Sequence, residues 1–256
     1  MTRIIAVANQ KGGVGKTTTS VNLGASLAAA KRRVLLVDLD PQGNATMGSG
    51  IDKAKLSYSV YHVLLGVVPA AAARVRSVAC GYDLLPTNRH LAGAEIELVS
   101  MPERETRLKR ALAVIADQYD YVLIDCPPAL SLLTVNAFVA ADAVMIPMQC
   151  EYYALEGLSD LVETIKRVRS NLNPQLEIEG LLRTMFDPRN TLAQQVSDQL
   201  TQHFGSKVYR TVIPRNIRLA EAPGFGRPVL EFDRQSKGAL AYLALAGEML
   251  NRAAIT

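Results

Sequence analysis

The sequence has few of the residues that build disulfide frameworks and metal centres. Only three of its 256 residues are cysteines and only three are histidines. They are Cys80, Cys126 and Cys150, and His62, His90 and His203. The cysteines are odd in number and show no C-x-x-C spacing, which argues against a disulfide framework and against a zinc or iron–sulfur site. We therefore expect three buried thiols, and the scattered histidines do not indicate a catalytic or metal-binding role.

Long hydrophobic runs are also missing. No uninterrupted apolar run approaches the roughly 18 to 20 residues that a membrane-spanning helix needs, and the first residues lead into a strand without the apolar core of a signal peptide. No polar low-complexity stretch indicates a linker or a disordered tail. Apolar residues make up 49% of the chain, enough for a sizeable core. We expect a cytoplasmic protein with one domain over residues 1–256 and no N-terminal helix-turn-helix extension.

Net charge is small as well. The formal charge is +4, from 28 basic and 24 acidic residues, which by itself does not indicate a nucleic-acid partner. Its distribution is more informative. Between Arg183 and Lys237 there are nine basic and five acidic residues, so this stretch holds the entire positive excess. The last third of the chain is therefore a candidate for contact with an anionic partner.

A glycine-rich stretch, residues 9–18, follows the apolar run 3–8 and precedes a helix-like segment. Three glycines in four positions let successive backbone N–H groups converge on one point, where an anion can accept from them. Lys16 would reach the β- and γ-phosphates of a nucleotide, and Thr17 would place its hydroxyl on Mg²⁺. The alternative is a glycine-rich turn with solvated lysines, but the order of strand, loop and helix favours a phosphate loop. The residues expected to hold the nucleotide are Lys11, Gly12, Gly13, Val14, Gly15, Lys16, Thr17 and Thr18.

Carboxylates follow two further apolar runs. Asp38 and Asp40 come after the run 34–37, and Asp125 ends the run 121–124 in the form of a Walker B strand. Because the carboxyl ends of parallel strands meet at one edge of a sheet, these side chains should face the phosphates. We expect Asp125 to hold Mg²⁺ through a water, since this ion keeps part of its hydration shell, and Asp38 to support the magnesium shell or the loop. An isolated carboxylate pair could instead cap a turn or a helix.

Strand and helix alternate along the whole chain. This rhythm predicts an α/β fold with a doubly wound, mostly parallel sheet and helices on both faces. The strands are expected at 3–8, 34–37, 82–86, 119–124, 143–147, 179–186 and 208–213. The helices are expected at 17–30, 58–65, 91–98, 101–118, 132–140, 155–170, 192–204 and 238–252.

The phosphate loop departs from the general pattern G-x-x-x-x-G-K-[ST], because Gln10 stands where the first glycine should be and Lys11 adds a second lysine. In this form it resembles the deviant Walker A motif of the ParA/MinD ATPases, a class of P-loop NTPase. Residues 38–44 and 125–128 resemble the switch I and switch II segments of that family, and residues 214–223 are a third region of resemblance. Essentially the whole chain is similar to small ParA-type (Soj-like) chromosome or plasmid partition ATPases.

This resemblance implies ATP and Mg²⁺ as cofactors and adds roles for particular residues. Lys11 would cross a dimer interface to the nucleotide held by the partner subunit, and with Lys16 and Asp40 it would make up the catalytic group. Asp40 would orient or activate the water that attacks the γ-phosphate. Pro214 and Asn216 would lie beside the adenine.

The resemblance also places DNA contacts in the basic last third. Arg189 and Arg218 match DNA-contacting positions, and Arg215 lies in the same group. Such contacts would go to the duplex backbone without sequence readout, because aromatic residues are sparse among the basic ones. The implied protein is an ATP-dependent homodimer on the nucleoid that hydrolyses ATP slowly until a ParB-type centromere-binding protein stimulates it.

Three other functions have to be considered. A MinD-like ATPase would bind membrane through a helix with a basic and a bulky apolar face. Residues 245–256 have Arg252 as their one basic residue, followed by two alanines. A metabolic P-loop ligase or kinase would have no reason for a basic last third. A nucleotide-regulated scaffold would show negligible hydrolysis.

Overall fold

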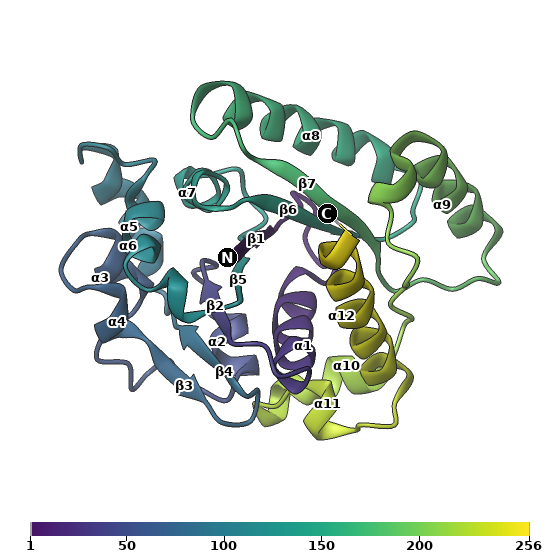
Figure 1. Cartoon of the computed structure of the whole chain (residues 1–256), viewed down its shortest axis with the longest axis horizontal. Helices are drawn as coiled ribbons and strands as arrows, with labels where there is room; N and C mark the ends of the chain where they lie inside the picture. Colours follow the sequence, from purple (N-terminus) through teal and green to yellow (C-terminus); the bar gives the residue numbers. More distant parts are fainter. Residues whose placement is uncertain (1, 256) are drawn as a thin grey trace.

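A computed structural model describes residues 2–255 and has one seven-stranded sheet at its centre (Figure 1). The strands are β1 (Arg3–Val7), β2 (Val34–Asp38), β3 (Val75–Ser77), β4 (Tyr82–Leu85), β5 (Tyr121–Asp125), β6 (Ala143–Met148) and β7 (Glu177–Arg183). Their order across the sheet is β3-β4-β2-β5-β1-β6-β7, and only the β3–β4 pair is antiparallel. The predicted mostly parallel sheet is confirmed.

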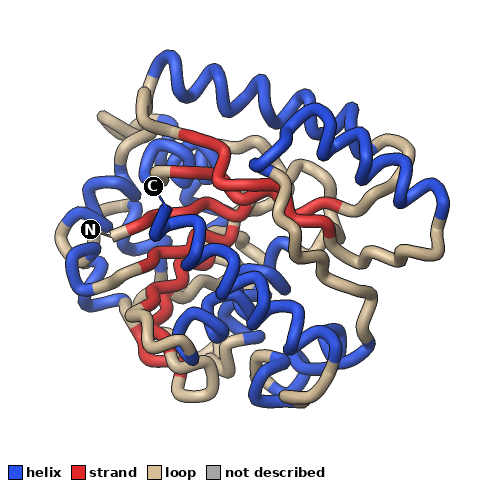
Figure 2. The backbone as a smooth tube through the Cα atoms, turned by 45° about the vertical axis from the view of Figure 1, so that its right-hand side comes forward, coloured by secondary structure: helices blue, strands red, loops and turns tan. Residues whose placement is uncertain are grey.

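Helices cover both faces of the sheet (Figure 2). The helices are α1 (Lys16–Ala29), α2 (Asn44–Gly48), α3 (Val60–Leu64), α4 (Ala70–Ala73), α5 (Leu91–Val99), α6 (Arg107–Ala113), α7 (Leu132–Ala140), α8 (Ala154–Asn171), α9 (Thr191–Phe204), α10 (Ile217–Glu221), α11 (Val229–Phe232) and α12 (Lys237–Ile255). Short 3₁₀ turns lie at η1 (Ala116–Gln118), η2 (Gly205–Lys207) and η3 (Ala222–Phe225). Helices α3 to α9 pack on one face, and α1, α2 and α10 to α12 pack on the other, where α1 and α12 lie side by side.

The central strands are apolar on both sides because each face has its own core. In β1, Ile5 packs with the α1 and α12 helices, and the next residue, Ala6, packs with the helices of the opposite face. In β2, Leu36 likewise packs on the face of α1 and α12, and Leu35 packs on the opposite face. Successive side chains of a strand alternate between faces, so a sheet covered twice requires continuous apolar runs. This explains why these strands could be recognised from sequence.

The register of the central strands brings three functional segments to one edge. Val7, the last residue of β1, pairs with Asp125 at the end of β5, and Asp38 at the end of β2 pairs with the same residue. The phosphate loop follows β1 directly. The carboxyl ends of β1, β2 and β5 therefore lie together at the position where sheets of this class bind ligands.

The predicted strand at 208–213 is wrong. This segment runs beside β7 but forms only an isolated bridge, between Leu181 and Val208. The N–H groups of Tyr209 and Ile213 donate to carbonyls of β7, and side chains satisfy several of the other backbone groups. The Glu248 carboxylate accepts from the N–H groups of Arg210 and Thr211, each at 2.8 Å. The Arg183 guanidinium donates to two carbonyls of the same segment. These contacts replace the ladder that a strand would need.

The single helix predicted over 101–118 is also wrong. Glu103 has a φ of 52°, in the left-handed region, so a helix cannot run through it. The chain instead forms α6, which starts at Arg107, and then η1. The edge strand β3 was not predicted, whereas the other predicted strands and helices are present with ends shifted by a few residues. Within residues 2–255, no helix combines the length and the apolar character that crossing a membrane requires.

Candidate functional site

The phosphate loop, residues 9–18, has the backbone shape that an anion cradle needs. Gly13 and Gly15 adopt φ values of 74° and 88°, which L side chains rarely take. A Cβ atom added at Gly12 or Gly13 would meet nothing within 4 Å, so this side of the loop is open. Helix α1 begins at Lys16, and the glycine that precedes it has no side chain to cap the helix. The first N–H groups of α1 are therefore suited to binding an anion.

Lys16 lies inside the loop. Its side chain is largely buried, with 7% of the residue exposed, and its Nζ donates to the backbone oxygen of Lys11 at 3.0 Å. Burial lowers the pKa of Lys16, and the carboxylates of Asp125 and Asp40 oppose that shift. The loop thus holds a partly desolvated ammonium group, whose attraction for a phosphate is stronger than it would be in water.

Asp125 joins the phosphate loop to the end of β5. Its Oδ2 accepts from the Thr17 hydroxyl and its Oδ1 from the Ser20 hydroxyl, both at 2.8 Å. The carboxyl is fully buried, and burial raises its pKa, while the two hydroxyl donors oppose the shift. A carboxylate beside a hydroxyl is the oxygen donor set that Mg²⁺ prefers, so these residues fit the predicted ion. Sequence reasoning missed Ser20, although it lies one helical turn after Thr17 and on the same face of α1.

Asp38 organises the segment after β2. Its Oδ2 accepts from the N–H of Thr46 at 2.8 Å and from the Thr46 hydroxyl at 2.6 Å, and its Oδ1 accepts from the N–H of Asp40 at 3.2 Å. Burial raises the pKa of this carboxyl to about 8. Asp38 was expected to support either the magnesium shell or the loop, and these hydrogen bonds show that it supports the loop. Asp40 is partly exposed and accepts from the N–H of Gln42 at 3.0 Å, which leaves it at the surface of the site.

Lys11 lies on the exposed side of the same loop. Its Nζ contacts the Glu151 carboxylate at 2.5 Å, and both side chains are about half exposed, at 48% and 52%. The backbone beneath it is fixed by Asn9, whose Oδ1 accepts from the N–H of Lys11 and whose Nδ2 donates to the carbonyl of Pro147. The two lysines of the loop therefore have different environments. Glu151 was not predicted, and its position, 140 residues away, gives no sequence signal.

The residues predicted to lie beside the adenine belong to the segment that leads into α10. Pro214 forms a bridge with Phe186, and Asn216 caps α10 by accepting from the N–H groups of Arg218 and Leu219 at 2.9 and 3.3 Å. This capping satisfies helix donors that would otherwise lack partners. The structure thus gives Asn216 a structural role, and its contact with adenine stays a prediction.

Two of the predicted DNA-binding arginines have acidic partners. Arg189 contacts Asp187 through its Nη2 at 2.8 Å, and Arg218 contacts Glu221 through its Nη1 at 2.8 Å and also a second carboxylate. Arg215 is exposed and forms no ion pair in the part of the chain that the structure describes. The predicted basic group is therefore at the surface, with two of its three arginines paired to carboxylates, and its role in DNA binding stays a prediction.

Other groups lie outside this site. The three cysteines are free and buried, as expected.

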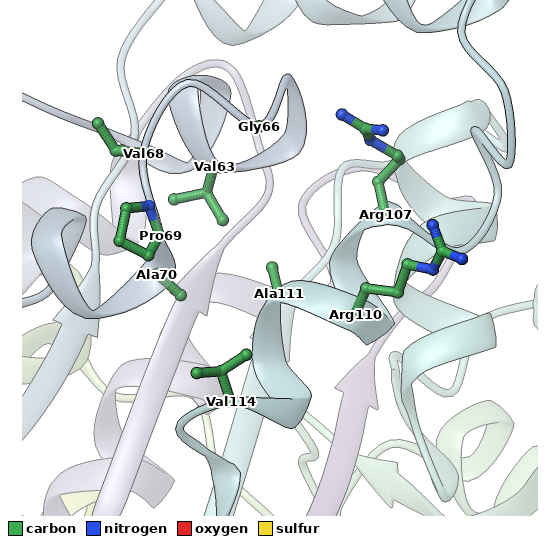
Figure 3. Close-up of a pocket in the computed structure, with 9 residues that line it drawn as sticks. All are labelled: Val63, Gly66, Val68, Pro69, Ala70, Arg107, Arg110, Ala111 and Val114. Carbon is green, nitrogen blue, oxygen red and sulfur yellow. The ribbon is translucent and has the colours of Figure 1, made fainter.

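A cavity of about 330 Å³ lies between α3, α4 and α6 (Figure 3). It is lined by Val63, Gly66, Val68, Pro69, Ala70, Arg107, Arg110, Ala111 and Val114. None of these residues belongs to the phosphate loop or to the segments that contact it.

Comparisons with known proteins agree with this geometry. A family model described as an AAA domain matches residues 2–178. The sporulation initiation inhibitor protein Soj of Bacillus subtilis (strain 168) is 55% identical, over 97% of this chain and 98% of its own length. The chromosome partitioning protein ParA of Caulobacter vibrioides (strain NA1000 / CB15N) is 53% identical, over 98% of this chain and 94% of its own.

A solved structure of a protein named cobyrinic acid a,c-diamide synthase, from Mycobacterium smegmatis, with a bound ATP analogue and magnesium, superposes with a TM-score of 0.86. Its sequence is 44% identical, and the match extends over 98% of this chain and 95% of the M. smegmatis chain. Identities above 50% to ParA and Soj extend over nearly the full length of both proteins. The chain therefore belongs to the ParA/Soj family of chromosome-partitioning ATPases.

Proposed function

We propose that this protein is a DNA-partitioning ATPase that dimerises when it binds ATP and Mg²⁺, binds duplex DNA without sequence preference, and leaves DNA after hydrolysis. A ParB-type partner would stimulate a slow intrinsic turnover. The observation that carries the proposal is the pair of lysines in the phosphate loop: Lys16 is buried inside it, and Lys11 is exposed on its outer side. A single nucleotide site needs only the first of these. We infer that the second would act on a nucleotide that another subunit holds.

Different residues of the site would bind different parts of the nucleotide and its metal ion. The backbone N–H groups of the glycines and Lys16 would bind phosphate oxygens, and Thr17 with Asp125 would hold Mg²⁺, which supplies neutralisation of phosphate charge. Asp40 would orient the attacking water. In a dimer, Lys11 would bring positive charge to the partner's γ-phosphate, where negative charge develops during transfer. Asp38 would keep Asp40 in position through the turn that it organises.

DNA binding would come from Arg189, Arg215 and Arg218. Affinity for a phosphate backbone increases with each phosphate neutralised, so a dimer that doubles the set should bind far more tightly than a monomer. The carboxylates beside Arg189 and Arg218 would weaken each contact, which keeps the monomer's affinity low. Such binding must fall as salt rises.

The test is duplex DNA binding with ATP, with ADP and without nucleotide, over a range of salt. We expect tight binding only with ATP and a marked fall with salt. The double variant Arg189→Glu/Arg218→Glu should reduce affinity by more than about tenfold, since it reverses two charges in each subunit. Arg76→Glu/Arg110→Glu is the matched control, because these two arginines are also exposed and ion-paired but lie on β3 and α6. Equal losses in the two double variants would contradict the placement of the basic surface.

A small-molecule ligase is a second candidate, because the 44% identical M. smegmatis protein carries the name of a diamide synthase. Such an enzyme would couple ATP cleavage to amidation of a carboxylate. It would hydrolyse or use ATP without any response to DNA.

Sedimentation with liposomes, in parallel with the DNA-binding test, would examine the MinD-like alternative. ATP-dependent binding to liposomes in the absence of DNA binding would contradict our proposal.

A further inference from the structure

A buried threonine ties the phosphate loop to the end of β7. Thr184 is 2% exposed, and its N–H donates to the carbonyl of Met148 at the end of β6, at 2.8 Å. Its hydroxyl donates to the carbonyl of Val14 at 2.7 Å, across 170 positions of sequence. A Cβ atom added at Gly15 would lie 3.7 Å from the Thr184 methyl carbon. The backbone of Thr184 is therefore held by the sheet, and its side chain is held against the loop.

This contact fixes the direction of one peptide group. The carbonyl of Val14 and the N–H of Gly15 belong to the same planar trans peptide, so they point in opposite directions. With the carbonyl held by Thr184, the N–H of Gly15 points away from Thr184. It is one of the N–H groups that the loop would offer to a phosphate. Rotation of this peptide would leave the buried Thr184 hydroxyl without its acceptor, which is costly in a site that excludes water.

The same segment leads to the basic surface. Met185, the next residue, has a φ of 49°, an uncommon value for a residue with a side chain. The N–H of Phe186 donates to the carbonyl of Ile213 at 3.0 Å, which joins the segment to the residues that precede α10. Three residues further on, Arg189 contacts Asp187. A stretch of six residues thus connects the Val14 carbonyl to one predicted DNA contact and to the segment that carries the other two.

We propose that Thr184 is a positioning residue that couples occupancy of the phosphate loop to the segment 185–190 and so to DNA binding. The proposal rests on the proposed function, because it concerns the same nucleotide and DNA sites. A phosphate bound by the N–H of Gly15 fixes the peptide that accepts from Thr184, and this restricts the segment that follows. Coupling of this kind is reciprocal, so DNA held by Arg189 must also favour the phosphate-bound loop.

The test compares Thr184→Val, which removes only the hydroxyl, with Thr184→Ser, which keeps it. Thr164→Val is the control, since the Thr164 hydroxyl donates within α8 and lies on the surface. Duplex DNA affinity is measured with a saturating nonhydrolysable ATP analogue and with saturating ADP. In Thr184→Val the ratio of the two affinities should fall by about fivefold, the effect of one hydrogen bond. Thr184→Ser and Thr164→Val should keep the ratio of the unmodified protein.

The outcomes separate the two proposals. If the unmodified protein binds DNA equally with the analogue and with ADP, the proposed function fails. If it discriminates and Thr184→Val discriminates equally well, the positioning role is wrong. The positioning role is also wrong if Thr184→Ser lowers the ratio of the two DNA affinities as much as Thr184→Val does.

A measurement on the unmodified protein without DNA covers the case in which Thr184→Val does not fold. Amide hydrogen exchange of residues 185–190 should slow when the ATP analogue binds, because local opening of the segment becomes rarer. Exchange in α5, on the opposite side of the sheet from α1, should stay unchanged. Unchanged exchange in residues 185–190 would overturn the coupling.

Discussion

At the residue scale, the two lysines of the phosphate loop show how one short motif places two like side chains in different environments. Lys16 is buried and bound to the loop's own backbone, whereas Lys11 is half exposed and bound to Glu151. Only the first is enclosed by the cradle. The difference comes from the positions of the two residues in the backbone. Lys16 is the first residue of α1, whereas Lys11 precedes the glycines of the loop.

Alanine substitutions should therefore affect different steps. Lys16→Ala should lower ATP affinity by about a hundredfold or more, because it removes a charged donor from a desolvated phosphate site. Lys11→Ala should keep ATP affinity within a few-fold of the unmodified protein and prevent the ATP-dependent dimer. Nucleotide titration and light scattering after size exclusion measure the two properties. Lys109→Ala, an exposed lysine of α6, is the control, and a dimer that forms normally in Lys11→Ala would contradict the role of this residue.

The sequence was sufficient for the residues of this site that lie in local motifs. Lys16, Thr17 and Asp125 could be predicted because each ends a strand or lies in the first turn of a helix. Ser20 could have been found from helical spacing. Thr184 could not, since its contact with the loop depends on how β7 lies beside β6, and no local pattern reports on that.

At the element scale, the predictions succeeded where an element is buried on both sides. Strands β1, β2 and β5 are continuous apolar runs, and they were found. The edge strand β3 has three residues and was missed, since pairing with β4 alone leaves little apolar signal. The segment 208–213 was predicted as a strand from the alternation of strands and helices, but a carboxylate and a guanidinium bind several of its backbone groups.

A buried network fixes the turn between β2 and α2. Thr46 donates its hydroxyl to Asp38 at 2.6 Å and accepts from the N–H of Thr87 at 2.9 Å, and all three residues are fully buried. Through Asp38 the network reaches the N–H of Asp40. The position of Asp40 thus depends on a hydroxyl eight residues from Asp38.

Thr46→Val should keep the shape of this network and remove the two hydrogen bonds of the Thr46 hydroxyl. The N–H of Thr87 would be buried without a partner, so we expect the free energy of unfolding to fall by about 2 kcal/mol. The urea midpoint should fall with an unchanged m value. ATP hydrolysis should decrease more than ATP affinity, because Asp40 lies beyond the turn. Thr201→Val, on the surface of α9, is the control, and equal stability of the two variants would contradict the importance of the network.

At the scale of the whole molecule, the sheet separates two cores and leaves one edge for function. Helices α3 to α9 fill one side, and α1, α2 and α10 to α12 fill the other. The phosphate loop, the turn after β2 and the end of β5 all open at the carboxyl edge. Exposed apolar side chains lie in segments that follow this edge, including Leu130 after β5 and Tyr152 and Tyr153 after β6. A second subunit could cover them.

In the proposed dimer, the ion pair between Lys11 and Glu151 would oppose the joining of two subunits. If Lys11 acts on a nucleotide held by the partner, as proposed, it has to leave Glu151 first. Neutralising the carboxylate in Glu151→Gln should therefore strengthen the ATP-dependent dimer, by up to about fivefold, the usual worth of an exposed ion pair. Stability of the single subunit should change by less than about 0.5 kcal/mol.

Sedimentation velocity with a nonhydrolysable ATP analogue, over a range of protein concentration, measures the dimerisation constant. The difference between Glu151→Gln and the unmodified protein should shrink as salt rises, because screening weakens the ion pair that the variant lacks. Glu163→Gln is the matched control, since Glu163 also forms an exposed ion pair, with Arg167 on α8. A weaker dimer in Glu151→Gln would show that the carboxylate acts across the interface and does not restrain Lys11. A protein that hydrolyses ATP and remains a single subunit throughout turnover would contradict the dimer itself.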